Sequence, residues 1–158
     1  MSLFKLAALS ALLLSTGQAL AHGPEEHGSN HSAVYGEPGD PTAQARVIEV
    51  AMREGDGKML FSPAVVTVTK GEQIRFQLKN EGELEHEFVF GTAEEIEVHA
   101  EMMKAMPDMK HDDPNAKRLE PKASGDIVWK FTTSGEFDFA CLIPGHKEAG
   151  MKGKIIVK

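Results

Sequence analysis

Three side chains that bind soft metals lie close together near the C-terminal end of the sequence, in the segment CLIPGHKEAGM. Cys141 is the only cysteine of the sequence. Four residues lie between Cys141 and His146, and four more lie between His146 and Met151. A thiolate, an imidazole and a thioether suit copper, whereas Mg²⁺ and Ca²⁺ prefer oxygen ligands. Zinc could use the first two groups, but its structural sites usually have four strong ligands. The alternative is a buried, inert cysteine with unrelated neighbours.

Short runs of alternating apolar and polar residues predict that β-strands carry these side chains. In the clearest run, Ile74, Phe76 and Leu78 alternate with polar residues. The runs that show this period are residues 45–52, 73–79, 84–90, 126–131, 136–141 and 153–158. Turn residues lie between them, which favours an antiparallel sandwich or a Greek-key barrel.

The same alternation directs Cys141 and a distant histidine, His86, toward the interior. Cys141 follows Phe139 on one apolar face, and His86 lies in phase with Leu84 and Phe88. A buried imidazole is costly without a partner, and a metal ion would serve both the imidazole and the thiol. Two histidines and a cysteine in a plane, with a weak axial methionine, form the ligand set of a blue-copper site.

The segment FDFACLIPGHKEAGMKGKIIV resembles the C-terminal signature of the cupredoxins, the plastocyanin and azurin group. In that family a strand, Cys, a loop, His, a loop, Met and a final strand follow one another, with a further His upstream. The resemblance covers roughly residues 45–158 and implies an all-β Greek-key sandwich or barrel. It also implies one type 1 copper site with His86, Cys141, His146 and Met151 as ligands. Glu87 departs from the pattern, because many members have Asn or Asp after the upstream histidine.

The N-terminal part of the chain is predicted to direct export and then to remain flexible. Residues 1–21 combine Lys5, an apolar run and small residues at Ala19 and Ala21, which is typical of a signal peptide cleaved after Ala21. The alternative is an uncleaved anchor. Cleavage implies a periplasmic protein. Residues 22–44 hold few apolar side chains and are expected to be flexible, whereas residues 45–158 form the predicted cupredoxin domain.

One segment of that domain, about residues 92–116, is predicted to be a helical, methionine-rich insertion. Thr92 could cap the helix, with Glu95 completing a capping box. The insertion and the N-terminal segment both hold candidate secondary copper ligands: His22, His27, His31, His99, Met102, Met103, Met106, Met109 and His111. Imidazoles suit Cu(II) and thioethers suit Cu(I), so additional copper ions could bind. For the N-terminal segment, the alternative is a flexible tail with scattered histidines. For the helix, residues 99, 102, 103 and 106 share one face, and the alternative is that its methionines pack in the core.

The formal net charge of −7 disfavours nucleic acids and anionic membranes as partners. A type 1 site together with His-rich and Met-rich clusters resembles periplasmic cupredoxins of the copper-tolerance, CopI-like type. That resemblance implies copper sequestration, or uptake and oxidation of Cu(I), with a copper exporter or a redox protein as partner. The alternative is a soluble electron carrier between redox complexes, without membrane association after signal cleavage. Neither reading is an enzyme, because the ligand set leaves no open position for substrate.

Overall fold

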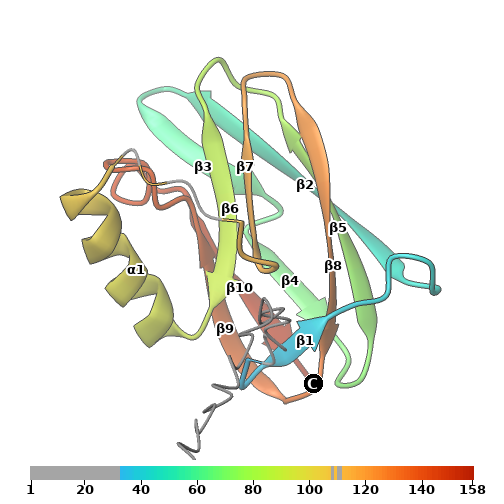
Figure 1. Cartoon of the computed structure of the whole chain (residues 1–158). Coiled ribbons are helices and arrows are strands. Elements are labelled where there is room, and N and C mark those ends of the chain that lie inside the picture. Colours follow the sequence, from blue (N-terminus) through green and yellow to red (C-terminus); the bar gives the residue numbers. More distant parts are fainter. Residues whose placement is uncertain (1–32, 108, 110–111) are drawn as a thin grey trace, which may run out of the picture.

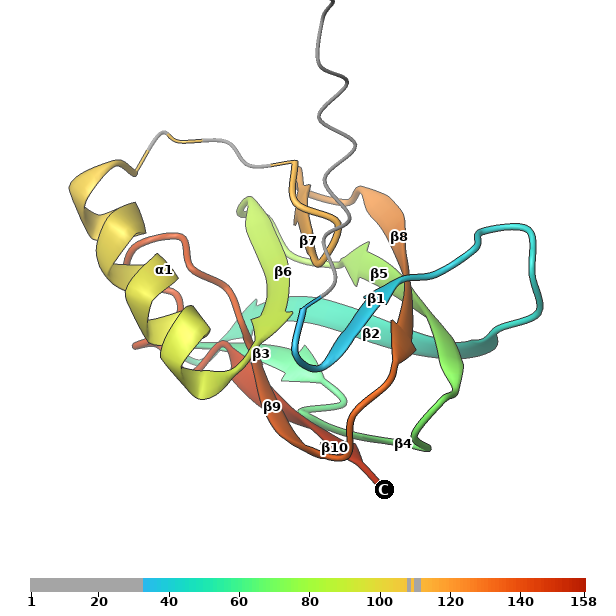
Figure 2. The same cartoon turned by 60° about the horizontal axis from the view of Figure 1, so that its bottom comes forward.

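The computed structural model describes residues 33–107, 109 and 112–158. In this part of the chain, strands β1–β10 form two five-stranded sheets that face each other, and the helix α1 lies outside them (Figures 1 and 2). The all-β sandwich predicted from strand alternation is therefore confirmed, and so is the helical segment between two of its strands.

The two sheets are built from strands that are distant in sequence. The first has the order β1 (Gly36–Pro38), β8 (Ser124–Phe131), β5 (Gln73–Asn80), β2 (Arg46–Gly55) and β3 (Lys58–Ser62). The second has the order β4 (Val65–Val68), β10 (Lys152–Val157), β9 (Gly135–Ala140), β6 (His86–Gly91) and β7 (Ala116–Leu119). Neighbours are antiparallel except for the parallel pairs β2–β5 and β4–β10. The chain passes from one sheet to the other several times, as in Greek-key sandwiches.

Aromatic rings fill the space between the sheets. The fully buried rings are Phe76, Phe88, Phe90, Trp129, Phe131 and Phe139. Phe76 of the first sheet meets Phe88 and Phe90 of the second, with ring centroids 5.3 and 5.8 Å apart. Each buried ring contributes about 1.5–3 kcal/mol relative to an exposed one. This core gives the loops at the end of the sandwich a rigid base.

The helix α1 (Ala93–Ala105) lies against β6 and β9 on the outer side of the second sheet (Figure 1). Its predicted capping box is present: the Thr92 hydroxyl accepts a hydrogen bond from the Glu95 N–H, and the Glu95 carboxylate accepts one from the Thr92 N–H. All six residues of β6 are buried, because the core covers one face of this strand and α1 packs beside the other. No helix among the described residues has the length and apolar character needed to span a membrane.

The structure differs from the expectation that residues 22–44 are flexible. Tyr35 is only 2% exposed, and its hydroxyl donates a hydrogen bond to the Phe90 carbonyl. Its ring stacks on Trp129, with centroids 5.5 Å apart, and the following strand β1 pairs with β8. One aromatic anchor and a three-residue edge strand hold this stretch, although its composition is polar. The folded domain thus begins before residue 45, and residues 22–32 lie outside the described part.

Candidate metal centre

Strand pairing brings His86 and Cys141 together. His86 is the first residue of β6, and Cys141 follows the last residue of β9. Because β6 and β9 are antiparallel, with Val89 opposite Ala140, the start of one strand lies beside the end of the other. The pairing of β9 with β10 similarly places Met151 next to Cys141, whose N–H donates to the Met151 carbonyl over 3.0 Å.

A turn between β9 and β10 carries His146. The His146 N–H donates to the Ile143 carbonyl, and the Met151 N–H donates to the His146 carbonyl, both over 3.0 Å. Gly145 and Gly150 have φ values of 89° and 110°. Residues that carry a Cβ atom rarely adopt these positive φ values, whereas glycine adopts them readily. These hydrogen bonds and glycines return the chain sharply, so that the imidazole of His146 faces Cys141.

Three of the four predicted ligands converge in one cluster. One ligand atom from each of His86, Cys141 and His146 lies within 4.8 Å of the other two. The two histidine Nδ1 atoms are 3.2 Å apart, and the Cys141 Sγ lies 3.3 Å from the His146 Nδ1. His86 and Cys141 are fully buried, whereas His146 is half-buried. Met151 is also fully buried, beside Cys141, so all four lie at the same end of the molecule.

The other nitrogen of His86 contacts a carboxylate that the sequence did not single out. The His86 Nε2 lies 2.6 Å from the Glu54 Oε1. The Glu54 carboxylate also accepts hydrogen bonds from the backbone N–H groups of Glu83 and Leu84. An ionised carboxylate can only accept, so the His86 Nε2–H is the donor in this contact. The Nδ1 of neutral His86 then carries a lone pair directed at the cluster. Burial favours a higher pKa for Glu54, but these three hydrogen bonds outweigh it and hold the pKa below its ordinary value.

Cys141 lies in surroundings that favour either a neutral thiol or a metal-bound thiolate. Burial raises the pKa of the thiol to about 12, although the Glu87 N–H, 3.3 Å from the sulfur, acts in the opposite direction. Burial also lowers the pKa of His146, and the neighbouring His86 adds to this effect. Neutral imidazoles and a thiol that gives up its proton to a cation are the states that metal binding requires.

This donor set fits copper. Two imidazole nitrogens and a sulfur form a triangle whose atoms can all carry lone pairs, and a buried methionine lies beside it. A carboxylate lies against the other ring nitrogen of one histidine, a contact that is common in metal sites. The described residues that converge here offer two ring nitrogens and a sulfur, a donor set that does not suit a hard, oxygen-preferring ion.

Two details of the predicted centre differ from expectation. Leu84, expected to share the inward phase of His86, is 46% exposed because it lies in the turn before β6. Glu87, the residue that departs from the family pattern, is buried at 3% exposure and contributes its backbone N–H to the cysteine sulfur. Sequence reasoning missed Glu54, since an acidic residue near the end of a strand carries no local signal of a contact 32 residues away.

The candidate secondary ligands are only partly brought together. Met103 is fully buried and packs with Ile96, Ala100 and Leu142, as in the core-packing alternative. Met102 and Met106 are 43% and 48% exposed. His99 and Met102 line a surface pocket, and Met109 packs partly against the cluster that contains Met103. His22, His27, His31 and His111 lie outside the described residues.

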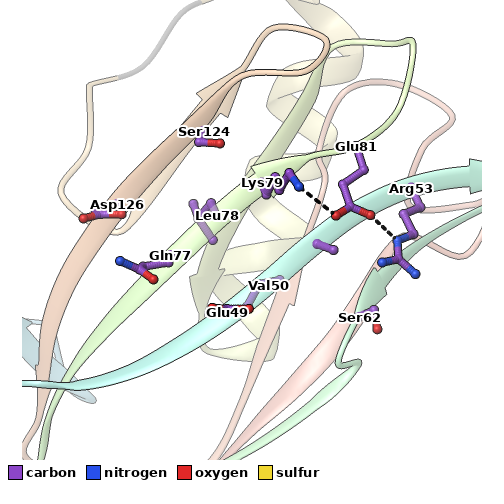
Figure 3. Close-up of a pocket in the computed structure, with 11 residues that line it drawn as sticks. Glu49, Val50, Arg53, Ser62, Gln77, Leu78, Lys79, Glu81, Ser124 and Asp126 are labelled. Atoms are coloured by element: carbon purple, nitrogen blue, oxygen red, sulfur yellow. Dashed lines mark hydrogen bonds and ion pairs between the residues drawn. The ribbon is translucent and has the colours of Figure 1, made fainter.

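A second pocket, of about 520 Å³, lies on the outer face of the first sheet (Figure 3). Figure 3 shows Glu81 between Arg53 and Lys79, and the carboxylate oxygens lie 2.7 and 3.3 Å from these two cations. No histidine, cysteine or methionine lines this pocket. The paired charges and the lack of soft ligands make it a polar surface hollow, separate from the cluster around Cys141.

The family model of copper-binding proteins of the plastocyanin/azurin family matches residues 48–158. The chain belongs to this family. The plastocyanin/azurin resemblance inferred from the loop at residues 141–151 is thereby confirmed. The match contains all the predicted type 1 ligands and the helical segment α1.

Relatives of similar length exist within this family. A copper-resistant cuproprotein CopI of Rubrivivax gelatinosus is 48% identical, over 95% of this chain and 93% of that protein. A copper-resistant cuproprotein CopI of Pseudomonas aeruginosa is 37% identical, over 81% of this chain and 84% of that protein. Among solved structures, reduced auracyanin from Roseiflexus castenholzii superposes with a TM-score of 0.60 at 24% identity, over 73% of this chain and 99% of its own. The last likeness supports the cupredoxin fold.

Proposed function

We propose that this protein binds copper at a type 1 centre formed by His86, Cys141, His146 and Met151, and that it serves copper tolerance in the periplasm. The observation that carries the proposal is the convergence of two imidazole nitrogens and the only cysteine sulfur within 4.8 Å. The similarity to copper-resistant cuproproteins over almost the full chain supports the physiological role. The predicted signal peptide at residues 1–21 supports export.

The protein residues would hold a copper ion in a site whose ligands are fixed by hydrogen bonds. His86 is anchored by Glu54 and Cys141 by the Glu87 N–H, while the turn hydrogen bonds fix His146. Copper bound there would supply one-electron exchange between Cu(I) and Cu(II). Oxidation of Cu(I) at the centre would require an external one-electron acceptor, such as a redox protein. Such rigidity favours a low reorganisation energy for electron transfer, because the ligands need not move when the copper changes its oxidation state.

The His146 side chain gives the centre its contact with the exterior. His86 and Cys141 are shielded from solvent, whereas His146 is half-buried on the turn. This partly buried imidazole is the proposed route for exchange of electrons with a partner. The same feature suits a soluble electron carrier, which remains the second candidate function.

Copper counting and spectroscopy test the centre. Purified protein should bind one tightly held copper with an intense thiolate-to-copper absorption band, and Cys141→Ser should abolish this band. His86→Ala and His146→Ala should weaken or shift it. The matched control is His99→Ala, which removes a histidine on α1 and should leave the band unchanged. Persistence of the band in Cys141→Ser would refute the ligand assignment.

Growth distinguishes the two physiological roles. A strain lacking the protein should grow poorly in high copper, and the wild-type gene should restore growth, whereas Cys141→Ser should not. Normal growth in copper, combined with loss of a respiratory or photosynthetic activity, would instead support the electron carrier. Secondary copper ions would appear as a stoichiometry above one that falls when His22, His27 and His31 or the exposed methionines are replaced.

A further inference from the structure

We propose that Glu54 is a positioning residue of the copper centre: its carboxylate holds His86 in the ligating tautomer and makes its Nδ1 a stronger donor to Cu(II). The inference rests on the proposed role of His86 as a copper ligand. It adds a residue from the first sheet to a centre whose expected ligands all belong to the second sheet or to its connecting loop.

The contacts of Glu54 leave its carboxylate little freedom. Oε1 accepts from the His86 Nε2–H at 2.6 Å and from the Leu84 N–H at 3.0 Å, and Oε2 accepts from the Glu83 N–H at 3.0 Å. The carboxylate therefore binds both the imidazole and the backbone of the turn that leads into β6. Its side chain is 21% exposed, so the contact with fully buried His86 is largely shielded from water.

The turn around Glu54 is built to admit its carboxylate. A Cβ atom at Gly82 would lie 2.2 Å from Oε1 and 2.3 Å from Oε2, so a larger residue there would displace the carboxylate from its present position. The buried side chain of Asn80 accepts from the Gly82 N–H and donates to the Leu84 carbonyl, which shapes the same turn. Glycine at position 82 and the hydrogen bonds of Asn80 thus leave the carboxylate space beneath the turn in its present position.

A carboxylate on the distal nitrogen of a metal-bound histidine acts in two ways. It fixes the tautomer and ring orientation, and it raises the basicity of the ligating nitrogen. Additional negative charge near the ion favours Cu(II) over Cu(I), because the more highly charged ion gains more from it. Glu54 should therefore raise the affinity for Cu(II) and lower the reduction potential of the centre.

The test compares copper affinity and reduction potential between wild type and Glu54→Gln, which keeps the shape of the side chain and removes its charge. Loss of such a partner typically lowers metal affinity 10–100-fold. We expect a Cu(II) affinity at least tenfold lower and a smaller loss for Cu(I). The potential should rise by about 59 mV for each tenfold difference between the two losses.

Glu72→Gln is the matched control. Glu72 also accepts a backbone N–H, from Thr69 at 2.8 Å, and its side chain is 25% exposed. Glu72 lies just before the first residue of β5, whereas the turn that contacts Glu54 follows the last residue of β5. Glu72 is therefore at the opposite end of this strand, far from the copper centre. The unfolding free energy of both variants is measured without metal. A change in potential that appears only in Glu54→Gln is then separate from any loss of stability.

Combination with His86→Ala distinguishes the inference from the proposal beneath it. If Glu54 acts through His86, Glu54→Gln should have no further effect on Cu(II) affinity in the His86→Ala background. Equal effects in both backgrounds would overturn the inference, as would an unchanged affinity and potential in the single variant. If His86→Ala alone retained full affinity and the absorption band, the ligand assignment itself would fail, and this inference with it.

A measurement on the wild type covers the case in which Glu54→Gln does not fold. Side-chain ¹⁵N NMR of the diamagnetic Cu(I) form reports which nitrogen of each histidine carries the proton. We expect the His86 Nε2 to be protonated and its proton to be protected from exchange with solvent. A deprotonated His86 Nε2, or a proton that exchanges as fast as that of a surface histidine, would overturn the inference.

Discussion

Met103 is the methionine of α1 for which packing and copper binding can be separated most sharply. Its side chain is fully buried in a cluster that contains Ile96, Ala100, Ala140 and Leu142. Met103→Ala removes three heavy atoms from this cluster and should cost about 2–5 kcal/mol of unfolding free energy. Met103→Leu keeps nearly the same volume and should cost less than about 1.5 kcal/mol.

Thermal unfolding and Cu(I) titration of the same variants provide the assay. For a chain of this size, 1 kcal/mol corresponds to about 2–4 °C in Tm, so Met103→Ala should unfold at least about 4 °C lower than wild type. Met103→Leu should bind as much Cu(I) as wild type, because a buried core methionine is not available to an additional ion. Replacement of the exposed Met102 and Met106 by Leu is the comparison, with a stability change of about 0.5 kcal/mol or less.

Two results would refute this reasoning. One is a folded Met103→Leu protein that binds less Cu(I) than wild type, because the sulfur and not the packing would then matter. The other is a Met103→Ala protein that loses less than about 1 kcal/mol of stability, since a fully buried side chain of this size should leave a costly cavity.

Three further predictions concern proton release, a buried amide and a tight packing contact. Burial raises the pKa of Cys141 to about 12, so copper binding near neutral pH should release the thiol proton. The apparent copper affinity should therefore rise about tenfold per pH unit between pH 7 and 9. A copper titration whose affinity does not change with pH would contradict this. Asn80→Ala should cost about 1–3 kcal/mol in denaturant unfolding, because the fully buried amide bonds several backbone groups. Gly153→Ala should lower Tm markedly, because its Cβ would lie 2.2 Å from the Phe139 ring and 2.4 Å from the Ala64 carbonyl; an unchanged Tm would show that β10 shifts freely.

Local patterns in the sequence were sufficient to predict β2, β5, β6, β8, β9 and β10 and much of the candidate centre. The shorter strands β1, β3, β4 and β7 were not predicted. Alternation along β9 placed Phe139 and Cys141 on the inward face, and both are fully buried. The capping box at Thr92 and Glu95 depends on residues three apart, so it could be recognised without any knowledge of the sheets. The ligand types in the loop at 141–151 likewise required only their spacing.

Features that depend on distant contacts could not be predicted in this way. Glu54 acquires its role only because β2 passes close to the turn before β6, and its own neighbours in sequence do not indicate this. The helix face that Met103 shares is determined by where α1 meets β6 and β9, which a helical repeat alone does not specify. Tyr35 anchors a polar segment through Trp129 and Phe90, both of which lie more than 50 residues further along the chain.

The turn that carries His146 contacts two other elements, β3 and α1. These contacts limit how the turn can be grafted between proteins. The Met59 N–H of β3 donates to the Ala149 carbonyl, and the Lys147 ammonium pairs with Glu97 of α1. A ligand loop grafted from another cupredoxin would need matching attachment points on a hairpin of one sheet and on a helix outside the other. Loop, hairpin and helix therefore form one exchangeable unit, and chimaeras that move all three together should retain a correctly shaped centre more often than those that exchange residues 141–151 alone.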